Sequence, residues 1–72
     1  MVEVDKRMIT SKIVDLLERK GPQSLENIHK ALKKEIGELS RNELNRALMR
    51  MEIHGLVRVY RIPRGKHRVE LA

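Results

Sequence analysis

Arginine side chains gather in the second part of this 72-residue sequence. Residues 41–72 contain eight basic residues against three acidic ones, a net charge of +5, and seven of the eight are arginines. Residues 1–40 contain eight basic and seven acidic residues, and six of those bases are lysines. A guanidinium binds phosphate or guanine through two parallel hydrogen bonds, whereas a lysine ammonium is a hydrated point charge. An arginine-rich basic segment is therefore typical of a surface that binds nucleic acid.

Three helices are predicted from apolar residues that recur at helical spacing. Their expected ranges are 5–20, 25–35 and 41–54. The third helix has the clearest start signal, because Ser40 and Glu43 have the spacing of a capping box. Its predicted buried face consists of Leu44, Ala47, Leu48 and Met51. On a helix with this inward face, Asn42, Arg46 and Met49 point most directly outward, with Asn45 and Arg50 beside them.

After the third helix the apolar pattern changes to alternation, which is typical of strands. Two strands are predicted over 56–62 and 66–71, joined by a three-residue loop with Gly65 in the left-handed conformation. This register places Val57 opposite Leu71 and Val59 opposite Val69, so the four apolar side chains share one face. On the other face Arg58 lies opposite Glu70, which predicts a structural ion pair.

Several classes of function are disfavoured by composition. The chain has no cysteine, and no apolar run approaches the length of a transmembrane helix. Tyr60 is the single aromatic residue, which argues against a single-strand binder built on stacked bases. The three histidines lack metal-site spacing and no catalytic motif is present, so we expect no metal, no cofactor, no small-molecule ligand and no enzymatic activity. We expect a cytoplasmic protein, nucleoid-associated if prokaryotic, without a membrane partner.

Two stretches carry a family resemblance. Residues 28–40 resemble the second helix and turn of a helix-turn-helix, and residues 47–57 (ALMRMEIHGLV) resemble the recurrent end of a recognition helix. With the basic hairpin that follows, about residues 8–72 resemble the winged helix-turn-helix DNA-binding family, including small archaeal and viral members. Met51 stands where the family usually has leucine. The resemblance implies an α+β fold and a single winged-helix domain over 1–72.

The resemblance also implies how the chain would meet double-stranded DNA, with the third helix in the major groove and the wing on the backbone or minor groove. Residues expected to contact base edges are Asn42, Asn45 and Arg46, because asparagine reads adenine and arginine reads guanine. Residues expected to contact phosphates are Arg41, Arg50, Arg61, Arg64, Lys66 and Arg68. A transcription regulator is the function this arrangement favours.

Two other functions stay open at this stage. Outward apolar residues would suit a winged helix that binds another protein, and they are Met49, Ile53, Tyr60 and Ile62. A basic winged helix that binds RNA, including one associated with the ribosome, is the other. A homodimer through the first helix or the N-terminal arm is also expected, with Met8, Ile53 and Tyr60 as self-association residues.

Overall fold

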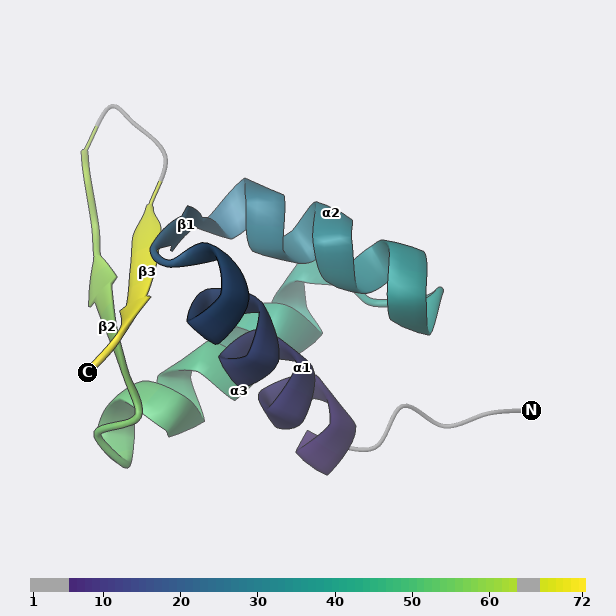
Figure 1. Cartoon of the computed structure of the whole chain (residues 1–72), viewed down its shortest axis with the longest axis horizontal. Helices are drawn as coiled ribbons and strands as arrows, with labels where there is room; N and C mark the ends of the chain where they lie inside the picture. Colours follow the sequence, from purple (N-terminus) through teal and green to yellow (C-terminus); the bar gives the residue numbers. More distant parts are fainter. Residues whose placement is uncertain (1–5, 64–66) are drawn as a thin grey trace.

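The computed structural model of the chain describes residues 6–63 and 67–72. Three helices are followed by a hairpin, as predicted (Figure 1). The helices are α1 (Lys6–Lys20), α2 (Leu25–Ile36) and α3 (Arg41–Ile53). The strands are β1 (Gln23–Ser24), β2 (Val57–Tyr60) and β3 (Arg68–Leu71). Among the described residues, no helix is long and apolar enough to cross a bilayer.

Helix α3 starts and ends where its sequence signals lie. Ser40 Oγ accepts a hydrogen bond from the Glu43 amide at 3.1 Å, and Glu43 Oε1 accepts one from the Ser40 amide at 3.3 Å. This capping box was predicted. At the other end the Gly55 amide donates to the Glu52 carbonyl, and the Leu56 amide donates to the Met51 carbonyl. This is a Schellman ending, which Gly55 permits by its φ of 75°.

The predicted hairpin register is confirmed, although the strands are shorter than expected. Val57 pairs with Leu71 and Val59 with Val69, so the ladder spans four residues of each strand. Arg61, Ile62 and His67 lie outside the strands, and Lys66 lies outside the described residues. Together β2, β3 and the residues between them, 57–71, are called the wing below.

A third strand was not predicted. Gln23 and Ser24 form β1, which pairs antiparallel with β3, so the order in the sheet is β1-β3-β2. The same Ser24 is the N-cap of α2, because its Oγ accepts from the Asn27 amide at 3.2 Å. The wing is thereby joined directly to the start of α2.

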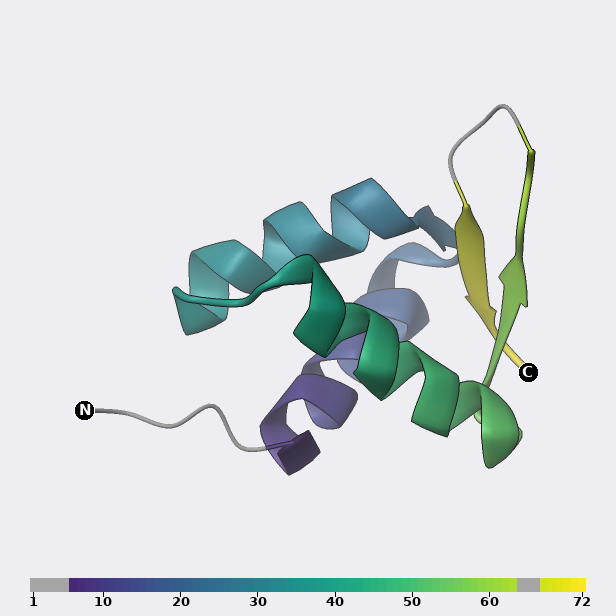
Figure 2. The ribbon, with the colours of Figure 1, turned by 180° about the vertical axis from the view of Figure 1, so that it is seen from behind.

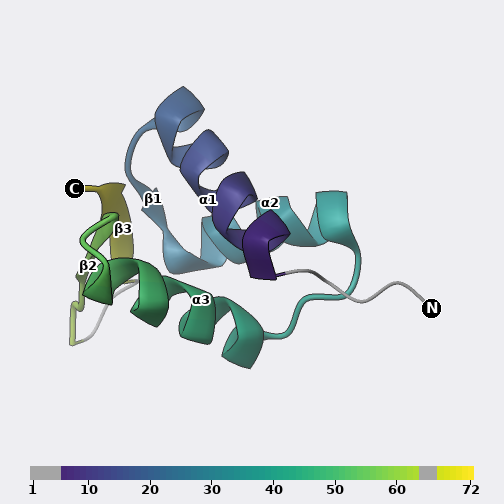
Figure 3. The same cartoon turned by 90° about the horizontal axis from the view of Figure 1, so that it is seen from below.

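One apolar cluster lies among the three helices and the sheet, and Figure 3 shows α1 and α2 together on one side of α3. Every helix and both wing strands contribute to it. Its members are Ile9, Ile13, Leu16, Leu17, Ile28, Leu32, Leu39, Leu44, Ala47, Leu48, Met51, Val57 and Val69. Since each helix buries one side here, each leaves its opposite side in solvent.

Replacing Ser40 with alanine is expected to lower the free energy of unfolding by about 0.5–2 kcal/mol, because the hydroxyl that accepts from the Glu43 amide and donates to the Glu43 carboxylate is lost. Urea denaturation followed by circular dichroism measures this. The matched control is Ser11→Ala, an exposed position inside α1, where alanine should be neutral or slightly stabilising. Equal stability of Ser40→Ala and wild type would contradict the role of the capping box.

Candidate nucleic-acid interface

Helix α3 crosses one face of the molecule, and its C-terminal end leads into the wing (Figure 2). The four residues predicted to face the core are buried. The three side chains predicted to contact bases, Asn42, Asn45 and Arg46, are exposed, and so are Arg41 and Met49. Arg50 differs from expectation, because it is half-buried. Successive residues of a helix are about 100° apart, so Asn45 and Arg46 project to different flanks of the exposed side.

Two adjoining surface hollows lie where α3 meets the wing and the first turns of α2. The first has a volume of about 160 Å³ and lies among α2, α3 and His67. The second, about 190 Å³, extends from Leu25 of α2 along α3 to β2 and the residue that follows it. Asn45 and His67 line both. Their other polar or charged lining residues are Glu26, His29, Arg41 and Arg61.

These α3–wing hollows divide the predicted contact residues. Arg41, Asn45 and Arg61 line them, whereas Asn42 and Arg46 do not. The groove between α3 and the wing therefore presents Asn45 rather than Arg46. Arg68 is exposed on β3, and the predicted contacts Arg64 and Lys66 lie outside the described residues.

His67 was not predicted as part of the site. Its carbonyl accepts a hydrogen bond from the Leu25 amide at 2.8 Å, which brings the start of β3 against the start of α2. Its Nδ1 atom is buried, and no described group forms a hydrogen bond with it. The only sequence signal was its position between two basic residues, Lys66 and Arg68, and that signal does not say which way the side chain turns.

The guanidinium of Arg61 is held by the carboxylate of Glu52 on α3. Arg61 Nη2 donates to Glu52 Oε1 at 3.1 Å, and Nη1 donates to Oε2 at 3.4 Å. Both side chains remain accessible, with exposed fractions of 58% and 35%. The hydrogen bonds and charge of Glu52 raise the pKa of Arg61, so it stays cationic. A residue expected to bind phosphate is thus partnered within the protein.

The prediction of an ion pair between Arg58 and Glu70 is wrong. The two residues are cross-strand neighbours, as predicted. The Glu70 carboxylate, however, accepts a hydrogen bond from the Tyr60 hydroxyl at 2.8 Å. Tyr60 is two residues along β2 from Arg58, and diagonal neighbours of this kind are within reach of an aromatic side chain. Arg58 is therefore an exposed wing arginine without a carboxylate partner among the described residues.

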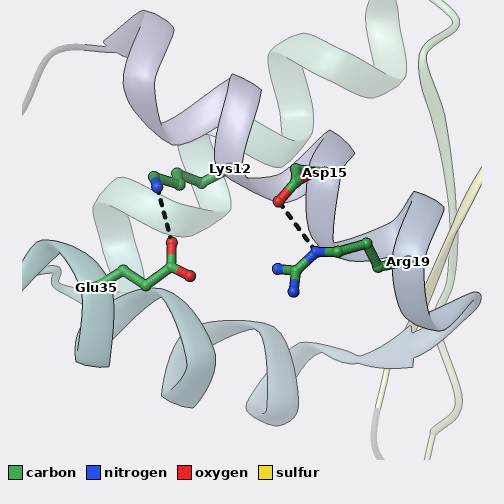
Figure 4. Close-up of polar contacts among 4 residues, drawn as sticks. All are labelled: Lys12, Asp15, Arg19 and Glu35. Atoms are coloured by element: carbon green, nitrogen blue, oxygen red, sulfur yellow. Dashed lines mark hydrogen bonds and ion pairs between the residues drawn. The ribbon is translucent and has the colours of Figure 1, made fainter.

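The N-terminal and C-terminal parts of the chain differ in how many of their basic side chains form ion pairs. On the face formed by α1 and α2, Lys12 pairs with Glu35 at 3.0 Å and Arg19 with Asp15 at 3.1 Å (Figure 4). Apart from Arg61, the arginines of α3 and the wing strands have no carboxylate partner in the part of the chain that the structure describes. They are Arg41, Arg46, Arg50, Arg58 and Arg68. The excess charge of the C-terminal part is therefore available to an external anion.

One histidine holds the turn before α3, and several apolar side chains are exposed. His29 is half-buried, and its Nε2 lies 2.7 Å from the Leu39 carbonyl, so it donates there and fastens the turn before α3. Within residues 6–63 and 67–72, no group of three potential metal ligands gathers. The self-association candidates are exposed, Met8 at 44%, Ile53 at 79% and Tyr60 at 46%.

Comparison with known proteins locates the fold. No family model matches the sequence, and no curated protein matches it. A solved structure, the apo form of the Zalpha domain of zebrafish PKZ, superposes with a TM-score of 0.75 at 24% sequence identity. The match covers 92% of this chain and 94% of that one. The three helices and small antiparallel sheet described above, with this match, establish the winged-helix fold.

Proposed function

We propose that this chain binds double-stranded DNA, with α3 in the major groove and the wing on the neighbouring backbone. The observation that carries the proposal is the set of unpaired arginines on α3 and the wing strands, next to hollows lined by Arg41 and Asn45. Duplex DNA presents regularly spaced phosphates, and unpaired cations bind them with release of counterions. The winged-helix fold supports the same proposal, since it presents one helix and one hairpin to a duplex.

Under this proposal the residues have different roles. Asn45 contacts a base edge from the α3–wing hollows. Arg46 and Asn42 contact bases in the same major groove of the DNA from the outer side of α3. Arg41, Arg50 and Arg68 hold phosphates on either side, together with Arg64 and Lys66. Binding involves no covalent chemistry. Transcription regulation in the cytoplasm or nucleoid is the biological role that we propose.

The test is selection of bound sequences from a random duplex pool at physiological salt, followed by titration of the enriched duplex across a salt series. Six phosphate contacts would give a log–log slope of about −5. An enriched motif with such a slope is expected. The chain has a net charge of +6. If it binds no duplex at low salt, the proposal is excluded. A competitor RNA hairpin distinguishes the RNA-binding alternative, because the major groove of RNA is too narrow for α3.

A second candidate function is binding to another protein. Exposed apolar residues lie on α3, on the turn after it and on the wing, and this observation favours the candidate. They are Met49, Ile53, Leu56, Tyr60 and Ile62, each at least 46% exposed. Retained partner binding after replacement of Arg41 and Asn45, but not after replacement of Ile53, would support it.

The Glu52–Arg61 pair makes a prediction within the proposed function. Glu52→Gln is expected to raise duplex affinity severalfold and to steepen the salt slope by about one, because Arg61 becomes free to bind a phosphate. Fluorescence anisotropy across a salt series measures both quantities. The matched control is Glu38→Gln, the same change of charge on an exposed residue of the turn before α3.

A double-mutant cycle decides whether Glu52 acts through Arg61. In an Arg61→Gln background, Glu52→Gln should lose most of its effect. If Glu52→Gln raises affinity equally in both backgrounds, Glu52 weakens binding by repelling the DNA phosphates directly, and its ion pair with Arg61 is not the cause.

A further inference from the structure

A second basic surface lies between α1 and α2, distinct from the α3–wing hollows. A hollow of about 270 Å³ runs between the end of α1 and the middle of α2. Three lysines line it, Lys20 from α1 and Lys30 and Lys34 from α2. Gln23, Asn27, Leu16 and Ala31 complete its lining. This lysine groove continues into a second hollow of about 310 Å³ that shares Lys20 and Lys34 and adds Lys12, Arg19 and Glu35 to the charged lining.

The lysines of the groove are not neutralised by the protein. The acidic residues on this face, Asp15 and Glu35, are paired with Arg19 and Lys12 (Figure 4). None of Lys20, Lys30 and Lys34 forms an ion pair with a carboxylate among residues 6–63 and 67–72. The groove is therefore a local concentration of positive charge.

One spacing within this arrangement is unfavourable for α2 itself. Lys30 and Lys34 are four residues apart on one side of α2, and like charges at that spacing destabilise a helix. Lys30 also lies in the middle of α2, away from the last turn where a cation would favourably meet the negative end of the helix dipole. Lys34 lies in the last turn, and Glu26 stands four residues before Lys30, so both lysines also have a favourable placement on the helix. What points to an external polyanion is the concentration of unpaired positive charge in one groove.

We propose that the lysine groove binds the phosphate backbone of a second duplex, so that one chain bridges two DNA segments. This inference rests on the proposed function, because the first duplex is the one held by α3 and the wing. Lysine rather than arginine, without an aromatic side chain, suits backbone contact independent of sequence. Helix α1, which borders the groove, faces the viewer in Figure 1, whereas α3 faces the viewer from the opposite side in Figure 2. The two shorter extents of the molecule are 24 and 22 Å, which leaves room for one duplex on each side.

The test is capture of a second duplex. A biotinylated duplex carrying the selected sequence is immobilised and saturated with protein, and a fluorescent duplex of scrambled sequence is then added at about 0.1 M salt. Wild type is expected to retain the fluorescent duplex. Lys30→Gln/Lys34→Gln should bind the immobilised duplex as wild type does, yet retain the second duplex at least about tenfold less, with a salt slope for that step reduced by about two.

Two controls make the result decisive. Lys33→Gln removes the same charge from the adjacent position of α2, which does not line the groove, and it should leave second-duplex capture intact. Thermal unfolding shows whether each variant is folded. Equal capture of the fluorescent duplex by wild type and the double variant would overturn the bridging proposal while the first binding step stands. Failure of wild type to capture it, when the immobilised duplex is bound, would do the same. Absence of binding to the immobilised duplex would instead overturn the proposed function.

Discussion

Ile13→Ala is expected to lower the free energy of unfolding by about 2–5 kcal/mol. Ile13 has no exposed surface and belongs to the cluster where α1 meets α2, α3 and β3. Shortening it removes buried methyl groups and leaves a cavity that the surrounding helices fill incompletely. Domains of this size have a modest reserve of stability, so the variant should be substantially unfolded at physiological temperature.

Urea and thermal denaturation measure this effect, with a fall in melting temperature of roughly 10–30 °C for a domain of this length. Met8→Ala on the same helix is the matched control. Met8 is 44% exposed, and its truncation should change stability by no more than about 0.5 kcal/mol. If Ile13→Ala cost less than Met8→Ala, α1 would not pack on the core as described.

The second large effect is expected from Asn45→Ala in DNA binding. Asn45 lines both α3–wing hollows and is exposed, so its amide can meet a base edge from between α3 and the wing. Loss of a bidentate contact between asparagine and adenine should weaken the selected duplex by about 1–3 kcal/mol, or roughly 5- to 150-fold in Kd. Binding to a scrambled duplex should change little, so preference for the selected sequence should fall.

The matched control is Ser11→Ala, which removes an exposed polar side chain from α1, outside the α3–wing hollows and outside the hollows between α1 and α2. It should leave both affinities unchanged. Arg46→Ala is the informative comparison, because Arg46 lies outside the hollows. A larger loss of sequence preference from Arg46→Ala than from Asn45→Ala would indicate that the duplex lies along the outer side of α3 rather than between α3 and the wing.

Much of the fold could be predicted from the sequence because its signals are local. The capping box at Ser40 and Glu43 sets the start of α3 through contacts three residues apart. The hairpin register follows from alternation of Val57, Val59 and Val69 across a short loop. Strand β1 was not predicted because Gln23 and Ser24 have no alternating apolar pattern. They form a strand only by pairing with β3, more than 40 residues later in the sequence.

The candidate site was predictable in composition but not in arrangement. Helix periodicity indicates that Asn45 and Arg46 face outward, yet it does not say which flank meets the wing. The partner of Arg61 is Glu52, which lies nine residues away on α3. From charge alone, several other acidic residues could have paired with Arg61. Glu70 takes the Tyr60 hydroxyl rather than Arg58 for the same reason. Such choices depend on tertiary geometry that residue spacing does not encode.

The short strand β1 has a mechanical consequence. Ser24 pairs with Arg68 and also caps α2, while the Leu25 amide donates to the His67 carbonyl. The root of the wing is therefore fastened to the first turn of a packed helix, and it cannot swing as an independent flap. Helix α2 also carries His29, which fastens the turn before α3, so the root of the wing and that turn are held to the same helix. Under the proposed function, α3 and the wing therefore meet a duplex in a fixed relative position, which reduces the entropy lost on binding.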